Sequence, residues 1–334
     1  MGRIHAVITA VGGYVPNYRL TNQELSAIVN TSDEWITQRI GIKERRILKP
    51  EEGKGVSYMA VKAIENMQNK HRFDPLEIEA VIFATSTPDY PLPNTASIVA
   101  AQMGMKRAFC FDMQAACSGF LFALETANNF ILSGKYKKIM VIAGEQLSVI
   151  TDYTDRNTCP IFGDGCACVL LEASEEENGI IDSFLQSDGS SPEHLHQYGG
   201  GSIHPASHET VDQRMHYIQQ DGRTVFKHAV SNMVSACKQI LKRNLLNKKE
   251  IDWVVPHQAN QRIIDSVAKY LDIPPEKAMV NIEYYGNTSA ASIPLCLWDW
   301  ESRLKKGDTL LLTAFGAGFT WGAILLKWAY DGHA

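Results

Sequence analysis

The sequence has few of the features that mark membrane proteins or disulfide-stabilised proteins. Its hydrophobic runs are short, and those at residues 80–84 and 139–143 fall far below the roughly 18 residues that a membrane-spanning helix needs. The 334 residues include seven cysteines, an odd number, and none of them form a C-x-x-C pair. A disulfide framework or a zinc ribbon is therefore not expected. The first residues also lack the pattern of a secretory signal, so we predict a protein of the reducing cytoplasm without a membrane partner.

Positively charged residues are also fewer than negatively charged ones. The 32 Lys and Arg residues are outnumbered by 37 Asp and Glu residues, which gives a net charge of −5. This balance argues against non-specific nucleic-acid binding, which requires a broad positive surface, so any basic site must be local. Only 24 Gly and 13 Pro residues are present, and 45% of the chain is hydrophobic. This composition predicts a packed globular protein, and the length suggests about two structural units.

A weak internal repeat runs through the chain. Residues 77–82 (EIEAVI) resemble residues 250–255 (EIDWVV) at a displacement of 173. Residues 139–144 (IMVIAG) correspond to residues 309–314 (TLLLTA) at a displacement of 170. These segments have the pattern of buried strands, and helical stretches alternate with them, which favours mainly parallel sheets covered by helices.

We therefore expect an α/β protein made of two similar halves. The acidic, turn-rich stretch at residues 175–179 breaks the hydrophobic pattern and marks the expected boundary. The predicted halves are residues 1–176 and residues 177–334. Each half carries, in order, an apolar strand, a turn of small residues and an amphipathic helix.

Cys117 occupies a position where a thiol could react. At a displacement of 170 it coincides with Asn287, and both are expected in a turn between a buried strand and a helix. The amides at a helix N-terminus favour a thiolate and can lower a cysteine pKa by about one unit or more. Position alone leaves a simpler alternative open, because free cysteines are commonly small buried core residues.

His257 follows an expected strand at residues 253–255 and opens an expected helix. In α/β proteins, ligands bind beyond the carboxyl ends of the strands, so His257, Asn287 and Cys117 lie where chemistry is expected. Taken singly, His257 could equally be a buried structural histidine, and Asn287 could support a turn through its side chain.

The segments around these three residues resemble a known family. They are QAACSGF at residues 114–120, PHQAN at residues 256–260 and GNTSAAS at residues 286–292. Further matching segments are TSDEWI at residues 31–36, FGDG at residues 162–165 and FGAGFTWG at residues 315–322. Nearly end to end, the chain is similar to β-ketoacyl-acyl-carrier-protein synthase III, a condensing enzyme of bacterial fatty acid synthesis. The resemblance implies the thiolase fold, a duplicated αβαβα architecture of five layers.

The resemblance also implies a catalytic role for each of the three residues. Cys117 would take an acyl group from acyl-CoA as a thioester, since a thiolate is needed to attack the carbonyl. Malonyl-acyl-carrier-protein would then lose CO2, and its enolate would attack the acyl group to give a β-ketoacyl product. A neutral His257 and the amide of Asn287 would stabilise the developing negative charge. Acyl-CoA is a substrate in this scheme, and no cofactor or metal is implied.

An oxyanion site formed by the backbone amides of Cys117 and Ala317 is implied as well. The family often has three glycines where this chain has Gly316, Ala317 and Gly318. A backbone N–H is retained when alanine replaces glycine, so the donor remains provided that φ at residue 317 is negative.

Coenzyme A requires a platform for its adenine and cations for its phosphates. The resemblance places the adenine between Trp35 and Arg156, with Arg39 nearby, and these residue types suit stacking and phosphate pairing. From the residues alone, Trp35 could be part of the core and either arginine a solvated surface charge.

An acidic carrier protein requires a local positive surface. Residues 223–249 contain seven Lys or Arg residues and no acidic residue, and a helix there would place several of the basic residues on one face. Without the resemblance, a solvated charged face is the alternative interpretation. By resemblance, the carrier-docking positions are Lys227, Arg262 and Lys269.

A stretch rich in histidine and glycine, at residues 194–216, holds five of the ten histidines. It lacks the spacing of known metal motifs, so we expect it to cover a substrate or dimer surface rather than bind a metal. Tyr90, Leu92 and this stretch are candidate walls of an acyl pocket. The sequence does not determine whether the primer is acetyl, branched or longer.

Two other functions stay open at this point. A related thiolase-fold enzyme could use other acyl acceptors or act as a polyketide-type synthase, and a non-catalytic protein could simply bind acyl groups. Formation of a β-ketoacyl-carrier product would discriminate against the related enzyme. A covalent acyl adduct would discriminate against the non-catalytic binding protein. The family usually forms homodimers, and we expect a homodimer here.

Overall fold

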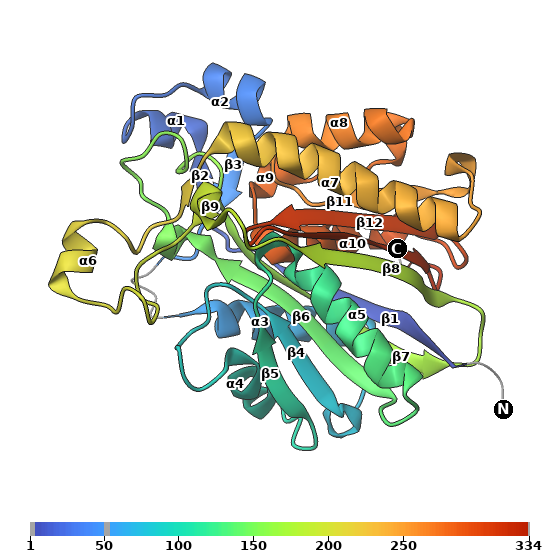
Figure 1. Cartoon of the computed structure of the whole chain (residues 1–334). Helices are drawn as coiled ribbons and strands as arrows, with labels where there is room; N and C mark the ends of the chain where they lie inside the picture. The colour runs from blue at the N-terminus through green and yellow to red at the C-terminus, as the bar shows by residue number, and fades with distance from the viewer. Residues whose placement is uncertain (1–3, 50–53, 333–334) are drawn as a thin grey trace.

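The computed structural model describes residues 4–49 and 54–332, and two large sheets form the centre of this part of the chain (Figure 1). The strands of the first sheet are β1 (His5–Tyr14), β4 (Ala80–Ala84), β5 (Phe109–Met113), β6 (Lys138–Gln146) and β7 (Asp164–Ser174). They lie in the order β1-β7-β6-β4-β5. The strands of the second sheet are β8 (Gly179–Ser187), β11 (Trp253–Pro256), β12 (Thr309–Gly316) and β13 (Thr320–Lys327). They lie in the order β11-β12-β13-β8.

Burial on both faces explains why the central strands are continuous hydrophobic runs. In β4, Ala80, Ile82 and Ala84 face the interior between the two sheets, while Val81 and Phe83 face a separate outer core. Successive side chains of a strand point to opposite faces, so a strand covered on both sides shows no alternation of apolar and polar residues.

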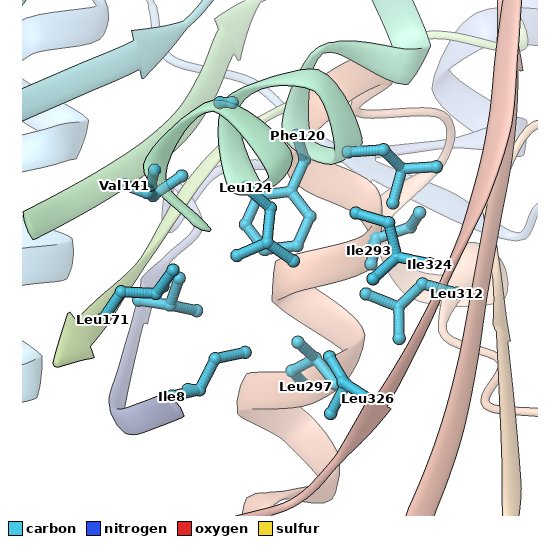
Figure 2. Close-up of a cluster of buried hydrophobic side chains, with 14 of the residues drawn as sticks. Ile8, Phe120, Leu124, Val141, Leu171, Ile293, Leu297, Leu312, Ile324 and Leu326 are labelled. Carbon is cyan, nitrogen blue, oxygen red and sulfur yellow. The ribbon is translucent and has the colours of Figure 1, made fainter. Parts of the chain in front are cut away.

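Two helices fill the space between the sheets. They are α5 (Gly119–Leu132) and α10 (Ser292–Trp300). Figure 2 shows Phe120 and Leu124 of α5 and Ile293 and Leu297 of α10 among side chains of both sheets. The labelled side chains of the sheets are Ile8, Val141, Leu171, Leu312, Ile324 and Leu326.

Further helices cover the outer face of each sheet (Figure 1). Those on the first sheet are α3 (Val56–Lys70) and α4 (Thr95–Gln102). Those on the second sheet are α7 (Gly222–Arg243) and α8 (Gln261–Leu271). The order helix, sheet, helix, sheet, helix confirms the predicted α/β fold with five αβαβα layers.

The prediction of mainly parallel sheets is wrong. β4 pairs parallel with β5 and β6, but β7 pairs antiparallel with both β1 and β6. In the second sheet, β11 and β12 are parallel, whereas β13 is antiparallel to both β12 and β8. Only residues 317–319 separate β12 from β13, and a connection this short joins antiparallel strands, because a parallel pair needs a crossover of about a dozen residues or more.

The two sheets are built alike, but the repeat has a different register from the predicted one near Cys117. The single turn of 3₁₀ helix at Ala116–Ser118 precedes α5, and the corresponding turn at Ser289–Ala291 precedes α10. These elements are displaced by 173 residues, so the counterpart of Cys117 is Ala290 and not Asn287. The strand predicted just before Asn287 is also wrong, because the short helix α9 (Ile282–Tyr285) occupies that place.

A short connection joins the first sheet to the second. β7 ends at Ser174 and β8 begins at Gly179, so the two sheets use strands from opposite sides of this connection. On this basis we propose the division into residues 1–176 and residues 177–334. The hydrophobic interior mixes side chains of both halves, which therefore share one core.

Smaller elements complete the described part of the chain. Two short antiparallel pairs are β2 (Arg19–Thr21) with β3 (Glu44–Arg46) and β9 (Leu195–His196) with β10 (Gln219–Gln220). The remaining α-helices are α1 (Asn22–Ser26), α2 (Asp33–Ile40) and α6 (His208–Asp212). Across residues 4–49 and 54–332, no helix has the length and hydrophobicity needed to span a bilayer.

Candidate active site

A cavity of about 830 Å³ brings together residues that lie far apart in the sequence. Cys117, His257, Asn287 and Ala317 all line it, although they come from four different segments. Trp35, Arg39 and Arg262 line the same cavity, whereas Arg156, Lys227 and Lys269 are not among its lining residues. The residues that carry the thiol, the imidazole and the carboxamide therefore share one cavity.

Cys117 lies at the tight junction between β5 and α5. The preceding residue, Ala116, has a φ of 45°, which is unusual for a residue with a side chain and reflects the sharpness of the turn. Gly316 packs against this turn, since a Cβ at that position would lie 2.6 Å from the backbone nitrogen of Cys117. The glycine therefore allows the end of β12 to approach the thiol-bearing turn closely.

The thiol of Cys117 is not intrinsically acidic in this environment. Burial raises its pKa to about 11, and hydrogen bonding with Ser289 offsets only part of that effect. Desolvation of the thiolate by burial is the largest cause of this shift, and the predicted effect of the helix N-terminus stays a prediction.

His257 directly follows β11, and both its backbone and its ring make hydrogen bonds. Its backbone N–H donates to the carbonyl oxygen of Thr313 at 2.8 Å. Its Nδ1 lies 2.7 Å from the hydroxyl oxygen of Ser292, the first residue of α10. Burial lowers the pKa of His257 to about 3, so the imidazole is neutral at pH 7, in agreement with the predicted neutral donor.

The backbone of Asn287 is hydrogen-bonded to residues in and just before the FGDG segment. Its backbone N–H donates to the carbonyl of Ile161 at 2.8 Å, and its carbonyl accepts from the N–H of Gly163 at 3.0 Å. Its side-chain Oδ1 accepts from the N–H of Ser289 at 2.8 Å. This contact uses the acceptor end of the amide and leaves its N–H groups as donors.

Ala317 lies in the connection between β12 and β13 and lines the cavity. Among the described residues, it is not one of the non-glycine residues with positive φ. An alanine at this position therefore does not need the positive φ that favours glycine. The hydroxyl oxygen of Thr320 lies 2.9 Å from the carbonyl oxygen of Ala115 and 3.1 Å from that of Ala317, and it can donate to either, which links this connection to the segment before Cys117.

Trp35 lies on α2, whose start and end are marked in the sequence. The Ser32 hydroxyl accepts from the N–H of Trp35 at 3.1 Å, and Gly41, with a φ of 80°, ends the helix. The guanidinium of Arg156 lies 4.8 Å from the centre of the Trp35 ring, and that of Arg39 lies 6.0 Å away. An adenine between Trp35 and Arg156 needs two stacking contacts of about 3.5 Å each, so the pair must separate to admit it.

The predicted carrier-docking residues lie on two helices that pack against each other, α7 and α8. Arg262 of α8 lines the cavity and lies 5.4 Å from the ring centre of Phe226. Lys227 of α7 and Lys269 of α8 are exposed. The basic run does not form one helix, because α7 ends at Arg243 and a separate turn follows.

The histidine- and glycine-rich stretch also reaches the cavity. Leu195, His196 and Gln197 line it, together with Ile218 and Gln220 just beyond the stretch. No group of side chains suited to a metal ion occurs in the described ranges, and the role of this stretch stays a prediction. Two other candidate walls, Tyr90 and Leu92, are exposed and do not line the cavity.

Sequence reasoning missed three residues that surround the thiol and the imidazole. Ser289 and Ser292 lie within the segment at 286–292 that carried the resemblance, but no role was assigned to them. Glu145 is a fully buried acid at the end of β6. A carboxylate at the end of a hydrophobic strand was the available signal for it, since buried acids are uncommon without a partner or a function.

The chain matches two family models. The model described as 3-oxoacyl-[acyl-carrier-protein (ACP)] synthase III matches residues 111–189, and its C-terminal counterpart matches residues 241–328. A relative from Azobacteroides pseudotrichonymphae, named beta-ketoacyl-[acyl-carrier-protein] synthase III, is 64% identical over 100% of both chains. A relative from Bacteroides thetaiotaomicron with the same family name is 59% identical over 99% of this chain and 98% of its own.

Solved structures are similar along the whole fold. The crystal structure of 3-oxoacyl-[acyl-carrier-protein] synthase III from Aquifex aeolicus has a TM-score of 0.89 and 43% identity, covering 97% of this chain and 100% of that one. The priming β-ketosynthase of a polyketide biosynthetic pathway has a TM-score of 0.90 and 29% identity, covering 99% of this chain and 98% of that one. Both similarities extend across the two sheets and the helices between them.

Proposed function

The chain belongs to the 3-oxoacyl-[acyl-carrier-protein] synthase III family, and we propose that it condenses an acyl-CoA primer with malonyl-acyl-carrier-protein to start bacterial type II fatty acid synthesis. It is an acyltransferase of the thiolase fold. The observation that carries the proposal is the convergence of a thiol with two neutral hydrogen-bond donors on one cavity. In the proposed reaction acyl-CoA is consumed as a substrate, and neither a metal nor an organic cofactor takes part.

The first step transfers the acyl group to Cys117. Its sulfur attacks the carbonyl carbon of the acyl-CoA thioester, and the negative charge develops on the carbonyl oxygen. We assign stabilisation of that oxygen to the backbone N–H groups of Cys117 and Ala317. Both residues line the cavity, and Gly316 lies close to the backbone of Cys117, which supports this assignment. Collapse of the tetrahedral intermediate releases CoA and leaves a thioester on Cys117.

The second step forms the carbon–carbon bond. Malonyl-acyl-carrier-protein loses CO2, and the negative charge of the resulting enolate lies on its thioester oxygen. A hydroxyl hydrogen of Ser292 donated to Nδ1 of His257 leaves the ring proton on Nε2, where it can be donated to that oxygen. The N–H groups of Asn287 supply the second donor. The enolate carbon then attacks the Cys117 thioester, the C–S bond breaks, and the released Cys117 thiolate takes a proton from solvent to regenerate the thiol.

The remaining assignments concern binding. We assign the CoA adenine to Trp35 and Arg156, with Arg39 nearby for phosphate, and the carrier protein to Lys227, Arg262 and Lys269. Arg262 links the two surfaces, since it is exposed on α8 and also lines the cavity. We further propose a cytoplasmic homodimer.

A direct assay tests the proposed function. Purified protein is mixed with malonyl-acyl-carrier-protein and, separately, acetyl-CoA, branched acyl-CoA and longer acyl-CoA primers, and the carrier protein is analysed by mass spectrometry. The proposal predicts a β-ketoacyl-carrier product with at least one primer, and competition among primers then ranks them. If every primer leaves the carrier protein without this product, the assignment is wrong and an alternative acyl acceptor takes its place.

A further inference from the structure

Arg45 is a fully buried arginine that the proposed reaction does not use. It is the middle residue of β3, and none of its surface is exposed to solvent. Within residues 4–49 and 54–332, no acidic side chain forms an ion pair with it. Burial lowers the pKa of Arg45 to about 10, so its guanidinium still carries a positive charge at pH 7. Because a buried charge is costly unless it is hydrogen-bonded, the acceptors around this cation indicate its role.

Three oxygen atoms from two distant parts of the chain accept hydrogen bonds from the Arg45 guanidinium. The carbonyl oxygen of Leu20 lies 3.0 Å from Nη1, and Oδ1 of Asn22 lies 2.8 Å from Nη2. The carbonyl oxygen of Pro160 lies 2.9 Å from Nη2. Leu20 is the partner of Arg45 in the β2–β3 pair, whereas Pro160 follows Arg45 by 115 residues. The guanidinium therefore joins the β2–β3 pair to the segment at residues 160–163.

The segment at residues 160–163 is in turn hydrogen-bonded to Asn287. The carbonyl oxygen of Ile161 accepts from the N–H of Asn287 at 2.8 Å, and the N–H of Gly163 donates to the carbonyl oxygen of Asn287 at 3.0 Å. Phe162, between them, pairs with Asn287 as an isolated parallel β-bridge. Pro160 directly precedes Ile161, so a shift of the Pro160 carbonyl would also move the backbone that contacts Asn287.

The aliphatic part of Arg45 packs against glycines on both sides of this contact. A Cβ added at Gly163 would lie 3.1 Å from the Cβ of Arg45, and one added at Gly286 would lie 3.2 Å from it. Gly286 directly precedes Asn287 and has a φ of 68°, which a side chain would disfavour. Arg45 therefore touches the 160–163 segment and also the residue next to Asn287.

The other two reactive side chains depend on different contacts. His257 is hydrogen-bonded through its N–H to Thr313 and through its ring to Ser292, and the Cys117 turn packs against Gly316. None of these contacts involves Arg45 or residues 160–163. Arg45 is also not among the residues that line the cavity, so it can act on the reaction only through its neighbours.

We propose that Arg45 is a positioning residue for Asn287. By joining the β2–β3 pair to the Pro160 carbonyl, it fixes the 160–163 segment and thereby the place from which the Asn287 amide donates to the enolate oxygen. This inference rests on the proposed function, because it deepens the role of Asn287 in condensation. A displacement of about 1 Å in a reactive group can cost about 100-fold in rate, so loss of this brace should slow the step that uses Asn287.

Substitution of Arg45 tests the proposal in the full-length protein. Arg45→Lys retains the charge, but an ammonium group cannot reproduce the fork of donors that reaches all three oxygen atoms. Acylation of Cys117 at saturating acyl-CoA is followed by intact mass, and decarboxylation of malonyl-acyl-carrier-protein by release of CO2. We expect acylation in Arg45→Lys to stay within a fewfold of the unmodified protein, while decarboxylation falls by about tenfold or more. Arg45→Met should be slower still in decarboxylation.

A double variant distinguishes positioning from a general loss of structure. If Arg45 acts through Asn287, adding Arg45→Lys to Asn287→Ala should lower decarboxylation by no more than about twofold beyond Asn287→Ala alone. Lys70→Met is the matched control, because the Lys70 ammonium donates to the buried Glu301 at 2.8 Å and neither residue lines the cavity. This variant also removes a contact between a cation and a distant part of the chain, yet it should leave the ratio of the two rates unchanged.

Hydrogen exchange of backbone amides tests the same link without any substrate. It is followed by mass spectrometry in the peptides that contain Gly163, Asn287 and His257. We expect Arg45→Lys to raise the exchange rates of the Gly163 and Asn287 N–H groups by about tenfold or more, because their hydrogen bonds open more often. The N–H of His257, which donates to Thr313, should change little.

The outcomes separate this proposal from the proposed function. Equal losses of acylation and decarboxylation in Arg45→Lys, full additivity with Asn287→Ala, or unchanged exchange at Asn287 would overturn the positioning role. If neither Arg45 variant folds, Asn22→Ala carries the test, because it removes one acceptor of the guanidinium and should give a smaller loss of the same selective kind. An unmodified protein that makes no β-ketoacyl product would refute the proposed function, while the exchange rates would still decide whether Arg45 fixes Asn287.

Discussion

The side-chain oxygen of Asn287 accepts a hydrogen bond from the backbone N–H of Ser289 at 2.8 Å, and this contact orients the amide so that its N–H groups are left for a ligand. Ser289 also lies in a turn that packs against the turn carrying Cys117. We assign Cys117 to acylation and Asn287 to condensation, which are different half-reactions. The two half-reactions are therefore separable by mutation.

Asn287→Ala separates them most simply. We expect acylation of Cys117 to stay within a fewfold of the unmodified protein, because the thiol and both oxyanion amides are retained. Decarboxylation of malonyl-acyl-carrier-protein should fall by about 100-fold or more, since one of the two donors to the enolate oxygen is lost. Intact mass measures the first quantity and release of CO2 measures the second.

Asn157→Ala is the control for that variant, because Asn157 lines the same cavity and has no assigned role in the chemistry. It should retain both activities. Equal loss of acylation and decarboxylation in Asn287→Ala would instead indicate a general disturbance of the site.

The buried His257 gives a pH-dependent contribution to folding stability. Its pKa falls from the ordinary 6.5 to about 3, so the unfolded chain binds a proton that the folded chain excludes as pH falls below 6.5. This histidine therefore destabilises the fold increasingly between pH 6.5 and pH 3. We expect the free energy of unfolding to drop less between pH 7 and pH 5 in His257→Gln than in the unmodified protein, by about 2 kcal/mol.

Denaturant unfolding at the two pH values measures this difference. Glu145 and Asp164 also titrate near this range, but they are common to both proteins and cancel in the comparison. The same pH dependence in both proteins would show that His257 binds its proton in the folded state.

Much of this organisation is predictable from the sequence, for identifiable physical reasons. Hydrophobic runs such as residues 80–84 specify strands buried on both faces, and their recurrence reveals the duplicated fold. Strand direction was predicted wrongly because it depends on the length of connections such as residues 317–319. The alignment of Cys117 with Asn287 failed because the two kinds of element repeat at different displacements. The strands near residue 139 repeat after 170 residues, whereas the turns before α5 and α10 repeat after 173 residues.

The candidate site was also predicted in part from the sequence. The thiol, the imidazole and the carboxamide do converge, and the chain segments that carry them bear recognisable motifs. The raised pKa of Cys117 and the position of Glu145 depend on burial and on side chains brought together by folding. Neither property is encoded in a local spacing, so sequence analysis alone could not supply it.

The contrast between Gly316 and Ala317 provides a further prediction. Gly316→Ala places a Cβ 2.6 Å from the backbone nitrogen of Cys117, so the turn must shift and acylation should fall by about tenfold or more. Ala317→Gly retains the backbone N–H and should acylate at nearly the original rate. Gly201→Ala is the control for the first variant, because a Cβ there meets no atom within 4 Å. A fully active Gly316→Ala would exclude a close contact between the two segments during the reaction.

Arg156 should contribute to binding of CoA and not to the chemical step. Its stacking on Trp35 at 4.8 Å places it where it can cover an adenine ring. We expect Arg156→Ala to raise KM for acyl-CoA by about tenfold while kcat changes little. Arg303→Ala is the matched control, because Arg303 lies over the Trp300 ring at 5.3 Å and neither residue lines the cavity. A fall in kcat without a change in KM would contradict this assignment.

The central claim is that Cys117 carries the acyl group, and intact mass after incubation with acyl-CoA tests it most directly. Cys110→Ser is the matched control, because Cys110 and Cys117 are the two partly exposed cysteines among the described residues and the other five are buried. The account predicts one acyl group on the unmodified protein and on Cys110→Ser, located by peptide mapping at Cys117, and none on Cys117→Ser. A stable acyl adduct of the same mass on Cys117→Ser, mapped to a different residue, would contradict it.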